Sequence, residues 1–243
     1  MKLYACSARL QMQTDDEALH DLRIALRRLR SLLRPLRKQE LCMALEKAAS
    51  AVGDASGPLR DLEVLAGELE RRGQPQAAKI RRMQLEGGRS RLLDGIPMLK
   101  LGILLDEWPE DQRRALCDGE WRVRGRDVGR YMRRQRQELA EALRDSSHDR
   151  HRLRLLIKRI RYCAEAWPQR VQLSGAELKA LRKVQSALGD WHDHWQWLQR
   201  ALIEPDLAPC VAAWRDRLAQ AEQDADQALS ELLEYYPLEQ RPF

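Results

Sequence analysis

The stretch from His20 to Lys38 carries a row of basic side chains that could bind a chain of anionic groups. The row holds one histidine and four arginines at helical spacing: His20, Arg23, Arg27, Arg30 and Arg34. On a helix these residues fall within an arc about 80° wide, and at about 1.5 Å per residue they span about 21 Å. Guanidinium groups make forked, charge-assisted bonds to phosphate oxygens and stay charged at physiological pH. The spacing therefore indicates a surface for a polyanion.

The same stretch carries an apolar row beside the basic one. Five leucines share a second arc: Leu22, Leu26, Leu29, Leu33 and Leu36. This pattern predicts a helix with one face in the core and the neighbouring face available to a ligand. Thr14 and Glu17 have the spacing of a capping box before it, and Pro35 predicts a kink or break near Arg34.

Charge is segregated along the chain more than its net value of +6 suggests. Among the 243 residues, 44% are hydrophobic and 33% are charged, which is enough apolar content for a core. Residues 23–38 contain seven basic residues and no acid, and residues 150–161 contain six and none. Residues 122–136 hold seven against one acid, whereas residues 204–239 hold nine acids and two arginines. The local positive field is therefore stronger than the total charge implies.

Cysteine use and hydropathy predict a cytoplasmic protein without a membrane segment. The five cysteines lie far apart with no CxxC pair, which favours a reducing compartment and buried thiols. No segment approaches 18 consecutive apolar residues, the length that a spanning helix needs.

Helical periodicity recurs along the chain, and no convincing alternating strand is present, so we predict an all-α fold. Residues 1–13 show little pattern, and residues 95–109 predict only a short helix between turns. The other predicted helices cover residues 39–52, 59–72, 75–93, 121–143, 148–167, 175–188, a short helix from about 191, and 207–236.

The sequence repeats itself in two places. A shift of 131 residues lays HDLRIALRRLR (20–30) on HRLRLLIKRIR (151–161), and a shift of 132 lays GPLRD (57–61) on GDWHD (189–193). Two neighbouring repeats in the same order predict two halves of like structure, about 14–118 and 121–236, related by pseudo-twofold symmetry. If both basic rows face a common centre, they form a basic channel. The repeat fails at Arg34, which corresponds to Glu165.

The repeated segments resemble the CHAD family, the conserved histidine α-helical domain. The resemblance rests on HDLRIALRRLR, LRDLEVL, HRLRLLIKRIRYCAE and LRKVQSALGDWHD, and it runs from about residue 14 to the C-terminus. It implies one CHAD-like domain over 1–243, built as two helical bundles around a central basic channel that binds inorganic polyphosphate. Many members have a full helix before the first histidine motif, whereas only about a dozen residues precede the cap here, so the completeness of the first bundle stays open.

The resemblance also implies which residues contact phosphate. The principal candidates are His20, Arg23, Arg27, Arg30, His151, Arg154, Lys158 and Arg161, with Arg34 added from the basic row. Weaker candidates are Arg28, Arg60, Arg126, Arg130, Arg133, Arg134 and Lys183. Asp61 and Asp193 are expected to orient neighbouring basic groups or to cap the short helices that follow them. Association with polyphosphate granules is a further expectation.

The sequence leaves several alternatives open for the role of the basic rows. An arginine-rich helix face is ordinarily solvated and paired with acids, and the acidic last helix could supply partners. Nucleic-acid binding is the second hypothesis. Single-strand binders stack bases on aromatic residues, but the basic rows have few of these, with Tyr131 and Tyr162 the nearest.

The hypothesis of an enzyme would need a bound metal ion. The candidate ligands are His148, His151, Asp190, His192, Asp193 and His194. No nucleophile–base pair, glycine-rich phosphate loop or two-metal carboxylate set can be assembled. Many CHAD proteins are fused to a CYTH triphosphatase with an ExExK motif, but residues 68–72 read ELERR in a helical context. We therefore predict a binding protein without catalysis, metal or cofactor.

Overall fold

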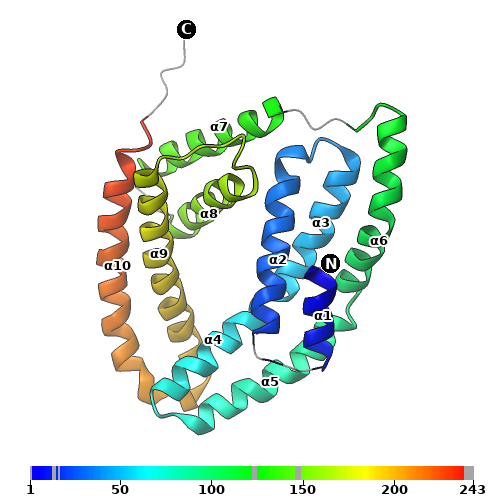
Figure 1. Ribbon diagram of the computed structural model, residues 1–243. Coiled ribbons are helices and arrows are strands. Elements are labelled where there is room, and N and C mark those ends of the chain that lie inside the picture. The colour runs from blue at the N-terminus through cyan, green and yellow to red at the C-terminus, as the bar shows by residue number, and fades with distance from the viewer. Residues whose placement is uncertain (1, 13–14, 16, 122–124, 146–148, 238–243) are drawn as a thin grey trace. The chain divides into compact units, whose positions relative to one another are not determined.

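The computed structural model describes residues 2–12, 15, 17–121, 125–145 and 149–237 (Figure 1). About 85% of the chain is helical, and the described residues contain no strand, so the all-α prediction is confirmed. The chain divides into two compact units, Met1–Asp127 and Val128–Phe243. None of the described helices is both long and apolar enough to cross a membrane. The pseudo-twofold relation and the central channel stay predictions.

The first unit carries the basic row on α2, which packs between α1 and α3. Its elements are α1 (Lys2–Met12), α2 (Ala18–Leu33), the 3-10 helix η1 (Arg34–Leu36), α3 (Glu40–Ala55), α4 (Gly57–Arg71), α5 (Pro75–Leu93) and α6 (Ile96–Cys117). Helix α2 contacts α1 and α3, α6 lies along α3, and α4 packs on α5. The basic row is therefore carried by a helix that has neighbours on two sides.

The leucine row of α2 forms part of the core, as its spacing predicted. Leu22, Leu26 and Leu33 are buried on α2, and Leu36 is buried just after it, whereas Leu29 is only half-buried. The predicted break before Pro35 is confirmed, because α2 ends at Leu33 and η1 follows.

The predicted capping box is wrong in its placement of Glu17. Glu17 is itself the N-cap residue of α2, and its side chain makes no capping bond. A capping box needs the glutamate three positions further on, inside the first turn. Thr14 lies outside the described residues.

Two segments of the first unit are more helical than their sequences indicated. The lead forms α1, which buries Cys6 and Leu10 against the unit, so the prediction of a patternless lead is wrong. Helix α6 replaces the predicted short helix and runs through Pro109 without a break. Only Leu101 of α6 is buried, and the apolar residues of 96–108 fall on all sides of the helix, so the segment has little apolar periodicity from which a helix could be predicted.

The second unit is built from α7 (Gly125–Ala142), α8 (Arg150–Ala166), α9 (Gly175–Ala201), the 3-10 helix η2 (Pro205–Cys210) and α10 (Val211–Leu233), of which α7 begins just before the unit boundary. Its core gathers apolar side chains from all four α-helices. The predicted break before Trp191 is wrong, because α9 continues through Gly189 while it packs along α10.

Polar contacts connect the ends of this unit's helices. The buried carboxylate of Glu177 accepts a 2.6 Å bond from Nη1 of Arg136. The Arg136 guanidinium also lies 4.9 Å from the centre of the Tyr236 ring. Arg144 donates a 2.8 Å bond to the backbone oxygen of Tyr236. Residues of α7, α9 and the segment after α10 are thereby tied together.

Candidate anion-binding site

The α2 face, defined as His20, Arg23, Arg27, Arg30 and Arg34, is partly covered. All five residues are half-buried, because α3 lies beside them. The leucines on the other side of α2 hold the helix in the core and so fix the direction of this face. The five predicted residues do lie on one side of one element and its 3-10 extension, but they are not a fully solvated surface.

Arg23 is fastened to the junction between α3 and α4. Its Nη1 donates 2.9 Å bonds to the carbonyl oxygen of Gly53 and to Oγ of Ser56. Carbonyls in the last turn of a helix carry partial negative charge, so a cation there is favourable. Arg23 therefore has a structural role in addition to its place on the α2 face.

Arg30 and Arg34 share one counter-ion on α3. Their Nε atoms lie 3.1 and 3.0 Å from Oε1 of Glu46. Burial raises the pKa of Glu46, but the bonds from Arg34 and Arg30 outweigh it, so the pKa of this carboxyl lies below its ordinary value. Two guanidinium groups thus share one carboxylate, and the group of three keeps a net positive charge. The expectation that acids pair with the basic row is partly met, although the partner comes from α3.

The α8 face, defined as His151, Arg154, Lys158 and Arg161, lies beside an apolar row of the same kind. Leu153, Leu156, Ile157 and Ile160 are buried on the other side of α8. Arg161 donates a 2.8 Å bond from Nε to Oε1 of Gln185 and lies 4.4 Å from the centre of the Tyr162 ring. It also pairs with Glu165, one turn further along α8.

His192 of α9 lies at the N-terminal part of the α8 face. Its ring centre is 6.1 Å from that of His151. Burial, and then the charges of Arg154, His151 and Lys158, lower the pKa of His192 to about 4. Three of the four predicted residues of the α8 face therefore lower the pKa of the same histidine.

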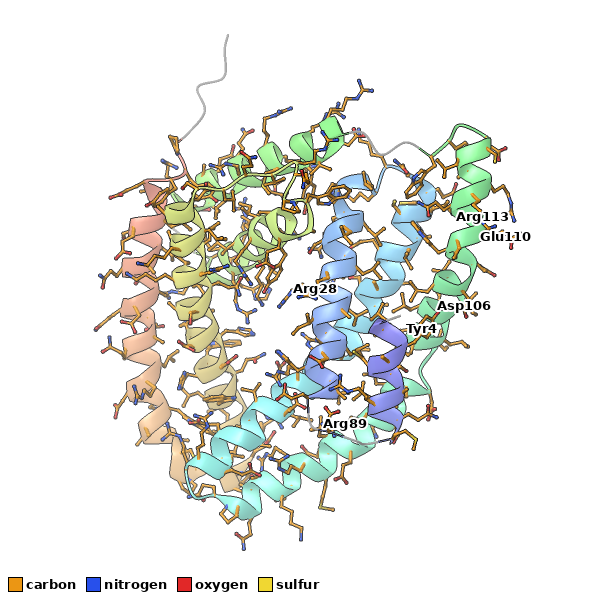
Figure 2. The ribbon with its side chains drawn as sticks, in the orientation of Figure 1. Tyr4, Arg28, Arg89, Asp106, Glu110 and Arg113 are labelled. Atoms are coloured by element: carbon orange, nitrogen blue, oxygen red, sulfur yellow. The ribbon has the colours of Figure 1, made fainter. Side chains whose placement is uncertain are left out.

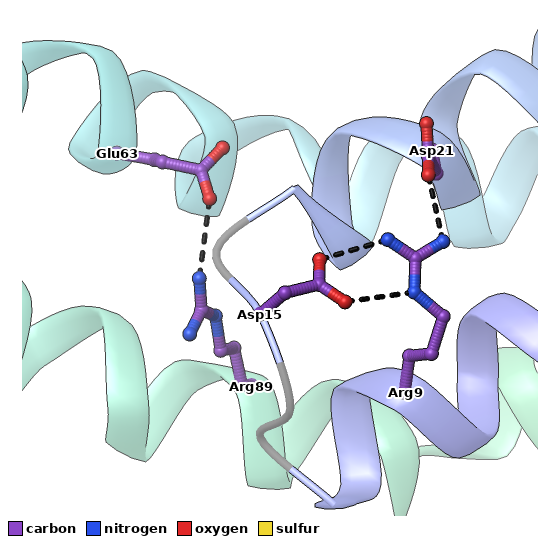
Figure 3. A network of polar contacts seen from close by, with 5 residues as sticks. All are labelled: Arg9, Asp15, Asp21, Glu63 and Arg89. Atoms are coloured by element: carbon purple, nitrogen blue, oxygen red, sulfur yellow. Dashed lines mark hydrogen bonds and ion pairs between the residues drawn. The ribbon is translucent and has the colours of Figure 1, made fainter.

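The weaker candidates are scattered, and several have carboxylate partners. Arg28 is exposed and extends outward from α2 (Figure 2). Arg60 is half-buried and pairs with Glu63, which also accepts a 3.1 Å bond from Arg89 (Figure 3). Lys183 binds Glu231 of α10 at 2.6 Å, so the acidic last helix does supply partners to basic residues.

The basic residues of α7 divide between solvent and the interior of the unit. Arg126, Arg130 and Arg133 are exposed, whereas Arg136 turns inward to Glu177. Arg134 donates a 2.7 Å bond to Glu138 on its own helix. Arg126, Arg130 and Arg133 have the i, i+4, i+7 spacing of one helix face, so these three form an exposed row that Arg136 does not join.

Asp61 and Asp193 lie inside α4 and α9, so the expectation that they cap short helices is wrong. An orienting role for both stays a prediction. Among the described residues no three histidine, cysteine or acidic side chains are close enough to hold a metal ion. His148 and Arg122 lie outside the described part of the chain.

The structure adds residues that the sequence reasoning did not assign to the site. Glu46 and Gln185 bind arginines of the two faces, and Trp191 and Trp195 lie near the His192 cluster. The repeat already offered a signal for His192, because it aligns this residue with Arg60, a predicted phosphate contact. Glu46 has no such signal, since the repeat does not extend to it.

Comparison with known proteins agrees with the all-helical fold. The family model described as CHAD domain matches residues 3–202, and the chain therefore belongs to the CHAD domain family. The crystal structure of the CHAD domain from the plant Ricinus communis is similar, with a TM-score of 0.73 and 25% identity over 98% of this chain and 89% of that one. No curated protein matches significantly. The resemblance seen in the sequence is confirmed.

Proposed function

We propose that the protein binds inorganic polyphosphate on the α2 and α8 faces. The observation that carries the proposal is the row of His151, Arg154 and Lys158 on one side of α8, with the His192 ring of α9 at 6.1 Å from that of His151. Basic groups on one face of a helix repel one another when charged, so an anion that lies along them relieves the repulsion as it binds. Membership of the CHAD domain family supports the same ligand.

Arginine and lysine on a helix suit a polymer of phosphates because their spacing provides a repeated set of contacts. Each cation that neutralises a phosphate releases condensed counter-ions, which supplies much of the affinity for a highly charged chain. By analogy with nucleic acids, binding should therefore weaken steeply as salt rises. The α2 face extends over about 21 Å, long enough for several successive phosphates.

Isothermal titration with long-chain polyphosphate at two salt concentrations tests the proposal. The double charge reversal Arg27→Glu/Lys158→Glu should abolish measurable binding at moderate salt. A matched control, Arg113→Glu/Arg215→Glu, makes the same change in net charge at two exposed residues of α6 and α10. If both double variants lose the same affinity, or if the intact protein does not bind polyphosphate at low salt, the proposal is wrong.

Nucleic acid is the second candidate ligand. Tyr162 is buried and accepts a 3.2 Å bond from Gln185, and Tyr131 is half-buried, so the two expected tyrosines are poorly placed for stacking. Trp195 of α9 is 44% exposed and is better placed. In a competition assay at equal phosphate concentration, displacement of polyphosphate by RNA would identify nucleic acid as the preferred ligand.

The proposal assigns no bond cleavage to these faces. The residues of the two faces supply positive charge, and they are held by contacts that fix their positions. Incubation of the purified protein with polyphosphate should therefore leave the chain length unchanged. Release of orthophosphate, lost in a variant of the α8 face, would instead support an enzyme.

A further inference from the structure

Two tryptophans of α9 form an aromatic platform next to the cation cluster of the α8 face. The rings of Trp191 and Trp195 are nearly parallel, with an angle of 23° between their planes and 6.4 Å between their centres. Trp191 lies 6.2 Å from the His192 ring, which itself lies 6.1 Å from His151. The platform and the cations therefore form one continuous surface within the second unit.

This platform differs from the tryptophans that build the core of the same unit. Trp197 is 6% exposed, Trp214 is fully buried, and their rings lie 5.4 Å apart where α9 meets α10. Trp195 is 44% exposed although it lies only two residues before Trp197. Packing of α9 against α10 therefore explains the burial of Trp197 and Trp214. It leaves a face of Trp195 in contact with solvent.

Arg150 holds Trp191 in place. Its guanidinium lies 5.7 Å from the centre of the Trp191 ring. Asp226 of α10 fixes the orientation of this guanidinium through a 2.8 Å ion pair. A cation over an indole ring is attracted to the ring's negative face. One side of Trp191 is thus occupied, and the exposed Trp195 is the ring on which a planar ligand can stack.

The distance between platform and cluster suits a small ligand that has both a ring and phosphates. His192 and Trp195 are three residues apart on α9, so their Cβ atoms lie about 5–6 Å from each other on one side of the helix. Aromatic rings stack on any nucleobase and do so without sequence preference, because every base has a π face. Arginine, lysine and histidine from α8 provide the contacts for the phosphates.

We propose that this surface of the second unit binds a nucleoside polyphosphate, with the base stacked on Trp195 and the phosphates among His151, Arg154 and Lys158. The inference rests on the proposed phosphate-binding function of the α8 face and adds the base to it. The same shift of 132 residues aligns Trp195 with Glu63, which has no aromatic ring. The base-binding site is therefore assigned to the second unit.

ATP and tripolyphosphate, titrated into the full chain at one ionic strength without divalent cations, test this inference. Both probes carry three phosphates, and ATP has one ionisable oxygen fewer, so tighter binding of ATP reports the nucleoside and not the charge. ATP should bind about tenfold more tightly, in keeping with the contribution of one stacked base. Trp195→Leu should remove this difference and leave the affinity for tripolyphosphate unchanged, whereas Trp195→Phe, which retains a ring, should keep most of it.

Equal affinity for ATP and tripolyphosphate, or a difference that survives Trp195→Leu, would overturn the inference. If long-chain polyphosphate binds in that experiment, the proposed function stands and only the nucleotide site is wrong. If neither polyphosphate nor ATP binds at low salt, both proposals fail. A single-stranded oligonucleotide that binds more tightly than ATP, in a manner dependent on Trp195, would replace the nucleotide by a nucleic acid.

Discussion

Arg161 of α8 pairs with Glu165 on the same helix, at the position where the repeat places Arg34 in the first unit. The repeat equates Arg161 with Arg30, and Arg30 also has a carboxylate partner, Glu46 of α3. Each unit therefore provides a counter-ion for this arginine, but from a different helix. The mismatch between Arg34 and Glu165 consequently leaves the C-terminal end of the α8 face less positive than that of the α2 face.

Glu165→Arg should strengthen polyphosphate binding, because it replaces the acid by the residue found in the first unit. The pair is exposed on the Glu165 side, at 44%, so its loss should change the free energy of unfolding by less than about 1 kcal/mol. The slope of log affinity against log salt should become steeper by about one to two. Titration at several salt concentrations measures this slope.

Glu165→Gln removes the negative charge without adding a positive one. It should therefore strengthen polyphosphate binding less than Glu165→Arg does. Glu234→Arg is a matched control, because Glu234 is an exposed acid just after α10 and outside both faces. An unchanged salt slope in Glu165→Arg would show that this end of α8 does not contact the polymer.

Glu46→Gln should lower stability and increase affinity at the same time. The carboxylate is 17% exposed and holds Arg30 and Arg34, so its loss should reduce the free energy of unfolding by about 1–3 kcal/mol. The two arginines then have no shared carboxylate, and phosphate can take its place. Denaturant unfolding and titration with polyphosphate measure the two effects.

Glu70→Gln provides the comparison for Glu46→Gln within the same unit. Glu70 is 45% exposed and pairs with Arg82 at 2.7 Å, away from the α2 face. Its replacement should cost less than about 1 kcal/mol and leave binding unchanged. If Glu46→Gln weakens binding, Glu46 acts by positioning the two arginines for the ligand, and the predicted competition between carboxylate and phosphate is wrong.

His192 should make stability depend on pH between about 4 and 6.5. Its pKa falls from 6.5 to about 4 in the folded protein, chiefly through burial and then through Arg154, His151 and Lys158. Between these values the unfolded chain binds the proton and the folded chain does not, so stability decreases as pH falls through this window. The effect should be about 1–2 kcal/mol, reduced from the full shift because the ring is only partly buried.

Denaturant unfolding of the intact protein and of His192→Gln at pH 7 and pH 4.5 measures this contribution. The difference in stability between the two proteins should shift in favour of the variant at the lower pH. A difference independent of pH would falsify the assignment of a neutral His192 between cations. Bound polyphosphate should offset the surrounding positive charge and raise the pKa of His192, so the pH dependence should shrink in its presence.

The sequence predicted the elements that periodicity marks clearly and missed those that it marks weakly. The α2 leucines gave its core side, and the bounds predicted for α5, 75–93, agree with the structure. The apolar residues of α6 fall on all sides of the helix and only Leu101 is buried, so its sequence offered no one-sided apolar pattern to detect. Gly189 suggested a break in α9, but packing along α10 stabilises a continuous helix by more than the roughly 1 kcal/mol that a glycine costs.

The candidate site was predictable as far as it depends on spacing within a helix. His151, Arg154 and Lys158 were placed together by their spacing, and the structure keeps all three on α8, with His192 of α9 beside His151. Contacts between helices were not predictable in the same way, because Glu46 reaches Arg30 and Arg34 only through the packing of α3 on α2. The exposure of Trp195 beside the buried Trp197 likewise depends on where α10 lies.

The contact of α4 with α5 should be sensitive to a single methyl group at Gly88. A Cβ atom built there would lie 2.2 Å from Cδ2 of Leu59, a buried side chain of α4, whereas one built at Gly87 meets nothing within 4 Å. Gly88→Ala should therefore force Leu59 out of its rotamer and lower the free energy of unfolding by about 1–3 kcal/mol.

Gly87→Ala, on the exposed side of the same helix, should raise the free energy of unfolding by about 0.5–1 kcal/mol, because alanine loses less backbone entropy on folding. Chemical denaturation of the two variants measures both values. Equal effects of the two substitutions would mean that Leu59 adapts without cost, and that α5 does not approach α4 closely at this position.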